Sequence, residues 1–337
     1  MNIIISKLES IRFLTPWIRL SKGENIKQQS TILLKSLGIP FLAFVIFLAL
    51  WDSAANSIET SLGKVPGPSQ VVEQAKGLWA IYENEKVNEK AFYGRQQKRN
   101  AARIEQDPDY QPRIREYRGR ITFIDQIFTS LYTVFAGFIL AMVIAIPLGI
   151  ATGLSKTLHS AINPIVQIFK PVSPLAWLPI VTIIVSAVYV SDDPMFQKSF
   201  ITSAITVTLC CLWPTLVNTS VGVANISPDL INVSKVLRLS WGTKVRKIVL
   251  PSALPMIFTG MRLSLGVGWM VLIAAEMLAQ NPGLGKFVWD EFQNGSSDSL
   301  GRIMVAVFTI GIIGFILDSI MTTLQRFVSW DQNETSN

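Results

Sequence analysis

The chain alternates between long apolar stretches and short polar or charged ones. Charged residues are absent from three windows, at residues 126–155, 171–191 and 199–228. Each window can cross the hydrocarbon core of a bilayer, which takes roughly 20 helical residues. Three further apolar segments are shorter or contain charges, at 36–51, 254–278 and 303–327. The pattern predicts an all-α membrane protein built as a bundle of six transmembrane helices.

The distribution of Lys and Arg predicts how these helices are oriented. Half of the 337 residues are hydrophobic and the net charge is +7. Basic residues gather in the amino-terminal tail and in two loops that six spans leave on the same side: Lys7, Arg12, Arg19, Lys22, Lys27, Lys35, Lys156, Lys170, Lys235, Arg238, Lys244, Arg246 and Lys247. Cytoplasmic loops carry such an excess, so both termini are expected inside. We expect the positive charge to face anionic lipid rather than nucleic acid.

A cleavable signal peptide is the alternative for the first apolar segment, because a basic region precedes it. That region is long for a signal peptide, and its removal would break the six-span count. The division expected from the sequence is a cytoplasmic segment 1–35, a first transmembrane helix 36–51, an external segment 52–125, a core of five transmembrane helices 126–330 with a large internal loop 227–253, and a cytoplasmic tail 331–337.

The external segment contains a charged insertion at residues 84–120. Its dense charge of both signs and few aliphatic residues prevent burial in lipid. Upstream, "VPGPSQVVEQAKGLWAIY" has the pattern of a short amphipathic helix at the outer membrane surface. The insertion is either a contact for an external partner or a solvated addition.

The segment "FKPVSPLAWLPI" cannot form one regular helix, because prolines recur along it. Irregular backbone at membrane depth is tolerated where it is buried in protein or lines a cavity. Pro171, Pro174, Trp177 and Pro179 are therefore candidates for a passage wall, with a kinked packing helix as the alternative.

Four charged residues fall inside predicted spans, where ionisable groups mark functional sites: Arg262, Glu276, Asp318 and, at the inner end of the last span, Arg326. Arg262 and Asp318 lie at matching depths, about 12 Å from the cytoplasmic side at 1.5 Å per residue. We expect them to form an ion pair between the last two helices, with direct contact to a passing anion as the alternative. Glu276 is expected near the outer mouth, as a gate or structural residue.

The largest internal loop, "LINVSKVLRLSWGTKVRKIVLPSALP", has apolar residues at helical spacing. The pattern predicts a helix, a turn near Gly242 and a second short helix that "LPSALP" ends before the next span. An interfacial helix lying flat on lipid is the alternative interpretation.

This loop resembles the coupling loop of binding-protein-dependent ABC importer permeases, which begins Glu-Ala-Ala, has a later glycine and ends in Leu-Pro. Here Asn232, Val233 and Ser234 replace Glu-Ala-Ala, Arg238 replaces the glycine, and Leu250 and Pro251 form the closing pair. With "KPVSPLAWLPI", "FTGMRLSLGVGWMVLIAAEML" and "NPGLGKFVWDEF", the chain is similar to the nitrate, nitrite, cyanate and bicarbonate branch, related to sulfonate and taurine permeases.

The resemblance implies a permease subunit in a bacterial cytoplasmic membrane, paired with a second copy as a homodimer. It implies two ATP-binding cassette subunits, which bind ATP and Mg, and an extracytoplasmic solute-binding protein. The expected contacts to the ATPase are Leu230, Asn232, Val233, Ser234, Leu237, Arg238, Leu239 and Trp241. The carried anion stays open between the branch members, and a sulfonate-type substrate is the alternative.

The sequence gives little support to other classes. It contains no Walker A motif, so ATP is expected on another chain. A membrane enzyme would need a nucleophile and base or clustered metal ligands, and the single histidine, His159, has no carboxylate beside it in the sequence. Cys210 and Cys211 lack metal-ligand spacing and are expected to pack or face lipid. An ion-driven secondary transporter would be expected to have several acidic residues at the membrane midplane or an inverted repeat, and the sequence shows neither.

Overall fold

The computed structural model describes residues 31, 34–60, 63–107, 110–190, 195–296 and 298–328. The chain divides into two compact units, which meet between Val72 and Glu73. The first unit contains a π-helix η1 (Leu34–Gly38), the helix α4 (Ile39–Ser57) and a two-stranded antiparallel pair, β1 (Glu59–Thr60) and β2 (Gly63–Lys64). The first predicted span is therefore a helix that continues past Asp52 to Ser57.

The predicted short amphipathic helix after this pair is in fact the 39-residue helix α5 (Pro68–Gln106). Pro68 suits a first helical turn, and Gln70 Oε1 accepts a hydrogen bond from Gly67 N. Beyond Tyr82 the helix runs into the charged insertion, where Glu, Lys, Arg, Gln and Ala are good helix formers. High charge kept this region out of the core, but it did not prevent helix formation.

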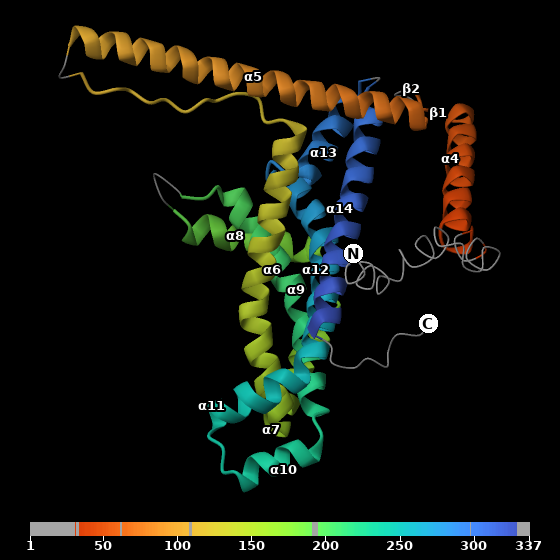
Figure 1. The fold of residues 1–337 in the computed structure, drawn as a ribbon, viewed down its shortest axis with the longest axis vertical. Helices are drawn as coiled ribbons and strands as arrows, with labels where there is room; N and C mark the ends of the chain where they lie inside the picture. The colour runs from red at the N-terminus through yellow and green to blue at the C-terminus, as the bar shows by residue number, and fades with distance from the viewer. Residues whose placement is uncertain are drawn as a thin grey trace, which may run out of the picture. The chain divides into compact units, whose positions relative to one another are not determined.

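Four long helices build the second unit: α6 (Phe123–Leu154), α9 (Lys198–Ala224), α12 (Leu250–Ala279) and α14 (Ser299–Val328). Figure 1 shows them running alongside one another. A Cβ on Gly149 of α6 would lie 2.6 Å from Cβ of Thr219 on α9, and one on Gly260 of α12 would lie 2.9 Å from Cα of Thr215. Glycines on both neighbours thus let α9 pack closely between α6 and α12, as small residues do in membrane bundles.

The proline-rich segment breaks the chain between α7 (Lys156–Phe169) and α8 (Pro174–Val188), which meet at an angle of 100°. Two corrections to the sequence analysis follow. The expected loop before Lys170 is mostly helix, and it carries His159, whose Nδ1 lies 3.5 Å from Ser220 Oγ. Within the window 171–191, the described helix α8 has 15 residues and a length of about 22 Å, shorter than the hydrocarbon core.

Short helices occupy the two ends of the bundle. Figure 1 places α10 (Pro228–Val236) and α11 (Trp241–Lys244) at one end and α13 (Leu284–Asn294) at the other. A π-helix η2 (Val245–Val249) joins α11 to α12. Among the described residues, five helices are long and apolar enough to cross a membrane, or six if the bent α7–α8 pair is one span. The all-α fold class is confirmed, and the count of six depends on that broken span.

Candidate functional site

Helix α10 ends in a turn whose geometry is set by Arg238. Its backbone has a φ of 47°, in the left-handed region that favours glycine. Leu239 N donates to Ser234 O, and Arg238 N donates to Lys235 O, both at 3.0 Å. These two bonds form a Schellman motif, which closes a helix at a left-handed residue. Arg238 is the residue that replaces the glycine of the coupling-loop pattern.

The sequence analysis placed the break near Gly242, but the structure places it at Leu237–Ser240. Ser240 Oγ then accepts a hydrogen bond from Thr243 N and caps the next helix. That helix does not end at "LPSALP", because Pro251 lies in the first turn of α12, directly after η2. The π-helical turn lets the chain pass Pro251, which lacks an N–H donor, and α11 therefore joins the span directly.

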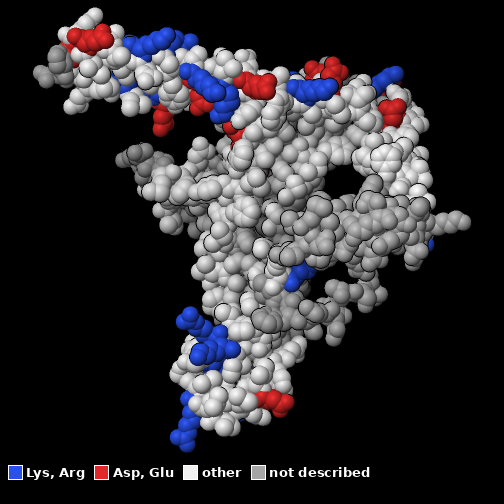
Figure 2. All heavy atoms as spheres, viewed as in Figure 1, with Lys and Arg blue, Asp and Glu red and all other residues white. Residues whose placement is uncertain are grey.

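One face of the stretch from α10 to η2, which we call the α10 segment, is apolar and exposed. Leu230, Val233, Val236, Leu237 and Trp241 are between 43 and 81% exposed. Ile231 and Val245 instead pack against a buried cluster from α6, α9, η2 and α12 that includes Val249 and Ala253. Figure 2 shows Lys and Arg side chains near this end of the bundle. The segment is therefore fixed to the core from behind and presents its apolar face outward.

Arg262 and Asp318 connect α12 to α14. Arg262 Nε lies 2.6 Å from Asp318 Oδ1, and Nη2 lies 2.7 Å from Oδ2. Such a two-pronged pair fixes the relative geometry of both side chains. The Arg262 side chain is 40% exposed and that of Asp318 is 48% exposed, so the pair lies on the surface of this single subunit. Nearby, Gln325 Nε2 donates to Thr259 Oγ1 at 2.9 Å and adds a second link between the helices.

At the opposite end of α12, Glu276 is fully buried rather than exposed at a mouth. Ser130 Oγ of α6 lies 2.9 and 2.8 Å from its two carboxylate oxygens. Gly285 N, in the first turn of α13, donates to Glu276 Oε2 at 3.0 Å. The carboxylate thus joins three helices, and its place at a helix N-terminus suits a negative charge. We call Glu276 with Ser130, Asn281 and Gly285 the latch.

The sequence analysis missed most of this latch. Asn281 Nδ2 donates to Thr133 Oγ1 at 3.2 Å and lies 3.5 Å from Glu276 Oε1. A Cβ on Gly283 would collide with the Glu276 carboxylate. The turn sequence "NPGLG", five residues beyond Glu276, was a signal that the chain returns there, although no periodicity pointed to Ser130.

The proline segment has a mixed environment. Pro171 and Pro179 are exposed, Pro174 and Trp177 are half-buried, and Leu178 is buried. Phe169 lies between two tryptophans, with ring centroids 5.6 Å from Trp177 and 6.2 Å from Trp213 of α9. The segment is thus held against α9 by aromatic contacts on one side and open on the other. Cys210 and Cys211 are both buried as free thiols, and Cys211 Sγ lies 3.2 Å from Ser264 O of α12.

These features define a helical membrane protein with a bundle of spanning helices. Comparison with known proteins gives its family. Residues 145–330 match the family described as "Binding-protein-dependent transport system inner membrane component". The chain belongs to this family, and it is a multi-pass membrane permease rather than an ATPase.

Two curated relatives and one solved structure illustrate the similarity. The nitrate import permease protein NrtB of Synechocystis sp. is 38% identical over 203 residues, covering 60% of this chain and 69% of the relative. The bicarbonate transport system permease protein CmpB of Synechococcus elongatus is 38% identical over 204 residues, covering 60% and 68%. An inward-facing structure of the MetNI methionine ABC transporter superposes with a TM-score of 0.52 at 16% identity, over 61% of this chain and 96% of that chain. That likeness concerns the fold alone.

Proposed function

We propose that this permease imports a small inorganic anion, nitrate or bicarbonate, with energy from ATP hydrolysed by partner subunits. The names of the relatives support the choice of anion. In this proposal two ATP-binding cassette subunits bind ATP and Mg, an extracytoplasmic protein delivers the substrate, and a second permease copy completes a homodimer.

The exposed apolar face of the α10 segment carries the mechanism. A helix that lays an apolar face into a groove is a common mode of protein recognition. Leu230, Val233, Leu237 and Trp241 would enter a groove on the ATPase, while Ile231 and Val245 fix the same segment to the core. Because α11 continues through η2 into α12, a displacement of the ATPase groove would reach the spanning helix without a flexible loop between them.

This assignment also orients the molecule. If α10 lies in the cytoplasm, then α13 and the latch lie on the outer side, and both termini are inside, as the basic residues predict. Glu276 would hold α13 closed against α6 and α12 until the spanning helices move. The segment from Pro171 to Pro179, with Trp177, would line the passage on its open side. Arg262 and Asp318 would hold α12 to α14 as a unit.

Uptake by intact cells tests the proposal. Deletion of the gene should abolish ATP-dependent uptake of labelled nitrate or labelled bicarbonate at low external concentration, and depletion of cellular ATP should do the same in unmodified cells. Unchanged uptake of both anions, with loss of taurine or sulfonate uptake, would instead favour the sulfonate-type alternative.

A further inference from the structure

The charged insertion forms a helix with a hydrogen-bonded return segment rather than an irregular loop. We call it the arm, defined as residues Asn84–Gln106 of α5 with the return segment Tyr110–Arg120. The return segment is extended and follows one face of α5. Gln96 makes two hydrogen bonds to the backbone of Arg115. Its Nε2 donates to Arg115 O at 3.2 Å, and its Oε1 accepts from Arg115 N at 2.8 Å. Asn100 Nδ2 donates to Arg113 O at 3.1 Å, and both amide side chains are buried.

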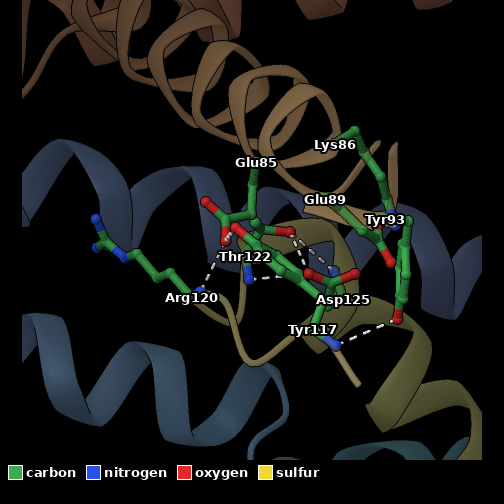
Figure 3. Close-up of polar contacts among 8 residues, drawn as sticks. All are labelled: Glu85, Lys86, Glu89, Tyr93, Tyr117, Arg120, Thr122 and Asp125. Carbon is green, nitrogen blue, oxygen red and sulfur yellow. Dashed lines mark hydrogen bonds and ion pairs between the residues drawn. The ribbon is translucent and has the colours of Figure 1, made fainter. Parts of the chain in front are cut away.

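The base of the arm is fixed to the bundle. Figure 3 shows Glu85 of α5 pointing toward the end of the return segment, where Tyr117 OH donates to Glu85 Oε1 at 2.8 Å and Arg120 N donates at 2.9 Å. The Glu85 carboxylate raises the pKa of Tyr117 above its ordinary value, so the phenol keeps the proton it donates. Two residues later, Thr122 caps α6 through Asp125. The arm is therefore continuous with a spanning helix through a hydrogen-bonded joint.

Charge is segregated along the arm. Residues 73–89, which form its base and the turns before it, contain four acidic and two basic residues, whereas residues 90–118 contain eight basic and four acidic ones. Lys90, Arg95, Lys98 and Arg99 are exposed, and none of them forms an ion pair with a described residue. We call the described residues of this second stretch, 90–107 and 110–118, the basic tip. Unpaired exposed cations of one sign create a field that attracts an oppositely charged partner.

The basic tip also carries an apolar groove. Tyr93, Ala101, Ile104, Pro112 and Ile114, together with three amide side chains of α5, line a hollow of about 410 Å³ where the return segment meets α5. Ile114 is 82% exposed and stands between Arg113 and Arg115. An apolar anchor site with a charged rim is the usual anatomy of a protein interface. A helix that lies on lipid needs a continuous apolar face, which α5 lacks beyond Ile81.

We propose that the basic tip docks an acidic surface of the extracytoplasmic solute-binding protein. The proposal rests on the proposed function, which places the α13 end outside, and α5 lies with α13 at the end opposite α10 (Figure 1). The arm also precedes residues 145–330, which match the family. It therefore lies outside the part of the chain that matches the family, on the side from which the proposed function brings the partner.

Charge reversal in the complete transporter tests this docking. The permease, with its ATPase subunits, is reconstituted in lipid nanodiscs, and the association rate and affinity of the cognate binding protein are measured from low to high salt. Lys98→Glu with Arg99→Glu should slow association about tenfold or more at low salt and flatten its salt dependence, because interface charges act mainly on the on-rate. Lys76→Glu, an exposed charge reversal on the same helix before the arm, is the matched control and should have little effect.

Three outcomes overturn the proposal: unchanged binding by the double variant, equal losses in the double variant and the control, or a loss seen only in nanodiscs rich in phosphatidylglycerol. The last result would make the arm a lipid contact. Uptake at saturating binding protein separates this proposal from the proposed function. If ATP-dependent anion uptake is normal there, the permease function stands whatever the arm does, and if the unmodified transporter shows no such uptake, the proposed function itself fails.

Discussion

Arg262 and Asp318 meet across α12 and α14 in a two-pronged ion pair, with nitrogen–oxygen distances of 2.6 and 2.7 Å, although they are 56 residues apart in sequence. Their matching depth was readable from the sequence, since each lies a similar number of residues from the same end of its span. Both side chains remain about half exposed in the single subunit. An ion pair at this depth requires protein or water beside it rather than lipid.

Loss of one partner should leave the other charge uncompensated. Asp318→Asn keeps the shape but strands Arg262, at a cost of about 2.5 to 3.5 kcal/mol for a lone charge at membrane depth. We expect the amount of assembled transporter in the membrane to fall several-fold, measured by blotting and by size-exclusion chromatography of the solubilised complex. Combining Asp318→Asn with Arg262→Gln should restore much of it. Normal assembly with altered anion uptake would instead place Arg262 in contact with the substrate.

Arg238 occupies a backbone conformation that glycine adopts without strain. A left-handed conformation costs an L-residue roughly 1 to 2 kcal/mol. Arg238→Gly should therefore stabilise the end of α10 by about 1 kcal/mol and slow hydrogen exchange of Leu239 N, which closes the Schellman motif. Lys235→Gly, at a helical position, should do the reverse, by about 1 kcal/mol. Faster exchange in Arg238→Gly would show that the Arg238 side chain stabilises the turn.

The latch depends on an acceptor at Glu276. Glu276→Gln replaces one of the two carboxylate oxygens with an NH2 group, so that Ser130 Oγ and Gly285 N no longer share two acceptor oxygens. A buried group left unsatisfied in this way costs about 1 to 3 kcal/mol. We expect α13 to loosen, with faster hydrogen exchange at Leu284 and Gly285. We also expect ATP hydrolysis that no longer needs the binding protein. A variant with unchanged exchange would remove the latch from the account.

Gly283 offers a second test of the same latch by steric means. A Cβ there would meet the Glu276 carboxylate, whereas one at Gly266 of α12 would meet nothing within 4 Å. Gly283→Ala should therefore lower the melting temperature of the purified complex by several degrees, and Gly266→Ala should leave it within about one degree. Equal effects of the two changes would indicate that α13 is not held as closely as the structure shows.

Close packing of α6 on α9 gives a matched pair of variants. A Cβ at Gly149 would lie 2.6 Å from Thr219 Cβ and 2.9 Å from Leu216 O, but Gly311 of α14 has open space around it. Gly149→Ala should force the helices apart and destabilise the bundle by about 1 to 3 kcal/mol. Gly311→Ala should be neutral. Their melting temperatures, measured in the same detergent, provide the comparison.

Much of this architecture followed from local patterns. Uncharged windows located α6 and α9, prolines located the break between α7 and α8, and the loop resemblance located Arg238. Other features depended on tertiary contacts. The helix of the arm was not predicted from its charged sequence, because the return segment, and not a hydrophobic core, covers Gln96 and Asn100. Glu276 could not be placed among its partners, because Ser130 lies 146 residues away and no periodicity connects them.

Pro251 shows why the structure of the internal loop at residues 227–253 was only partly predicted. Proline usually ends a helix, and on that basis the second short helix was expected to end before the span. In the structure, the π-helical turn η2 comes directly before Pro251 and accommodates its missing N–H donor. The helices α11 and α12 are therefore joined through η2 without a loop between them. A movement of the exposed face formed by Leu237 and Trp241 would therefore be transmitted to a spanning helix.

The most direct test of the account is the number of anions imported per ATP hydrolysed by the reconstituted transporter. The variant is Leu237→Ser with Trp241→Ser, two residues 63 and 70% exposed on the apolar face. Phe315→Ser, at an apolar position of α14 that is 73% exposed, is the control. We predict that the double variant inserts normally but loses the ATPase subunits or imports no anion as they hydrolyse ATP, while the control retains import. An unchanged ratio of anion to ATP in the double variant would contradict coupling through this segment.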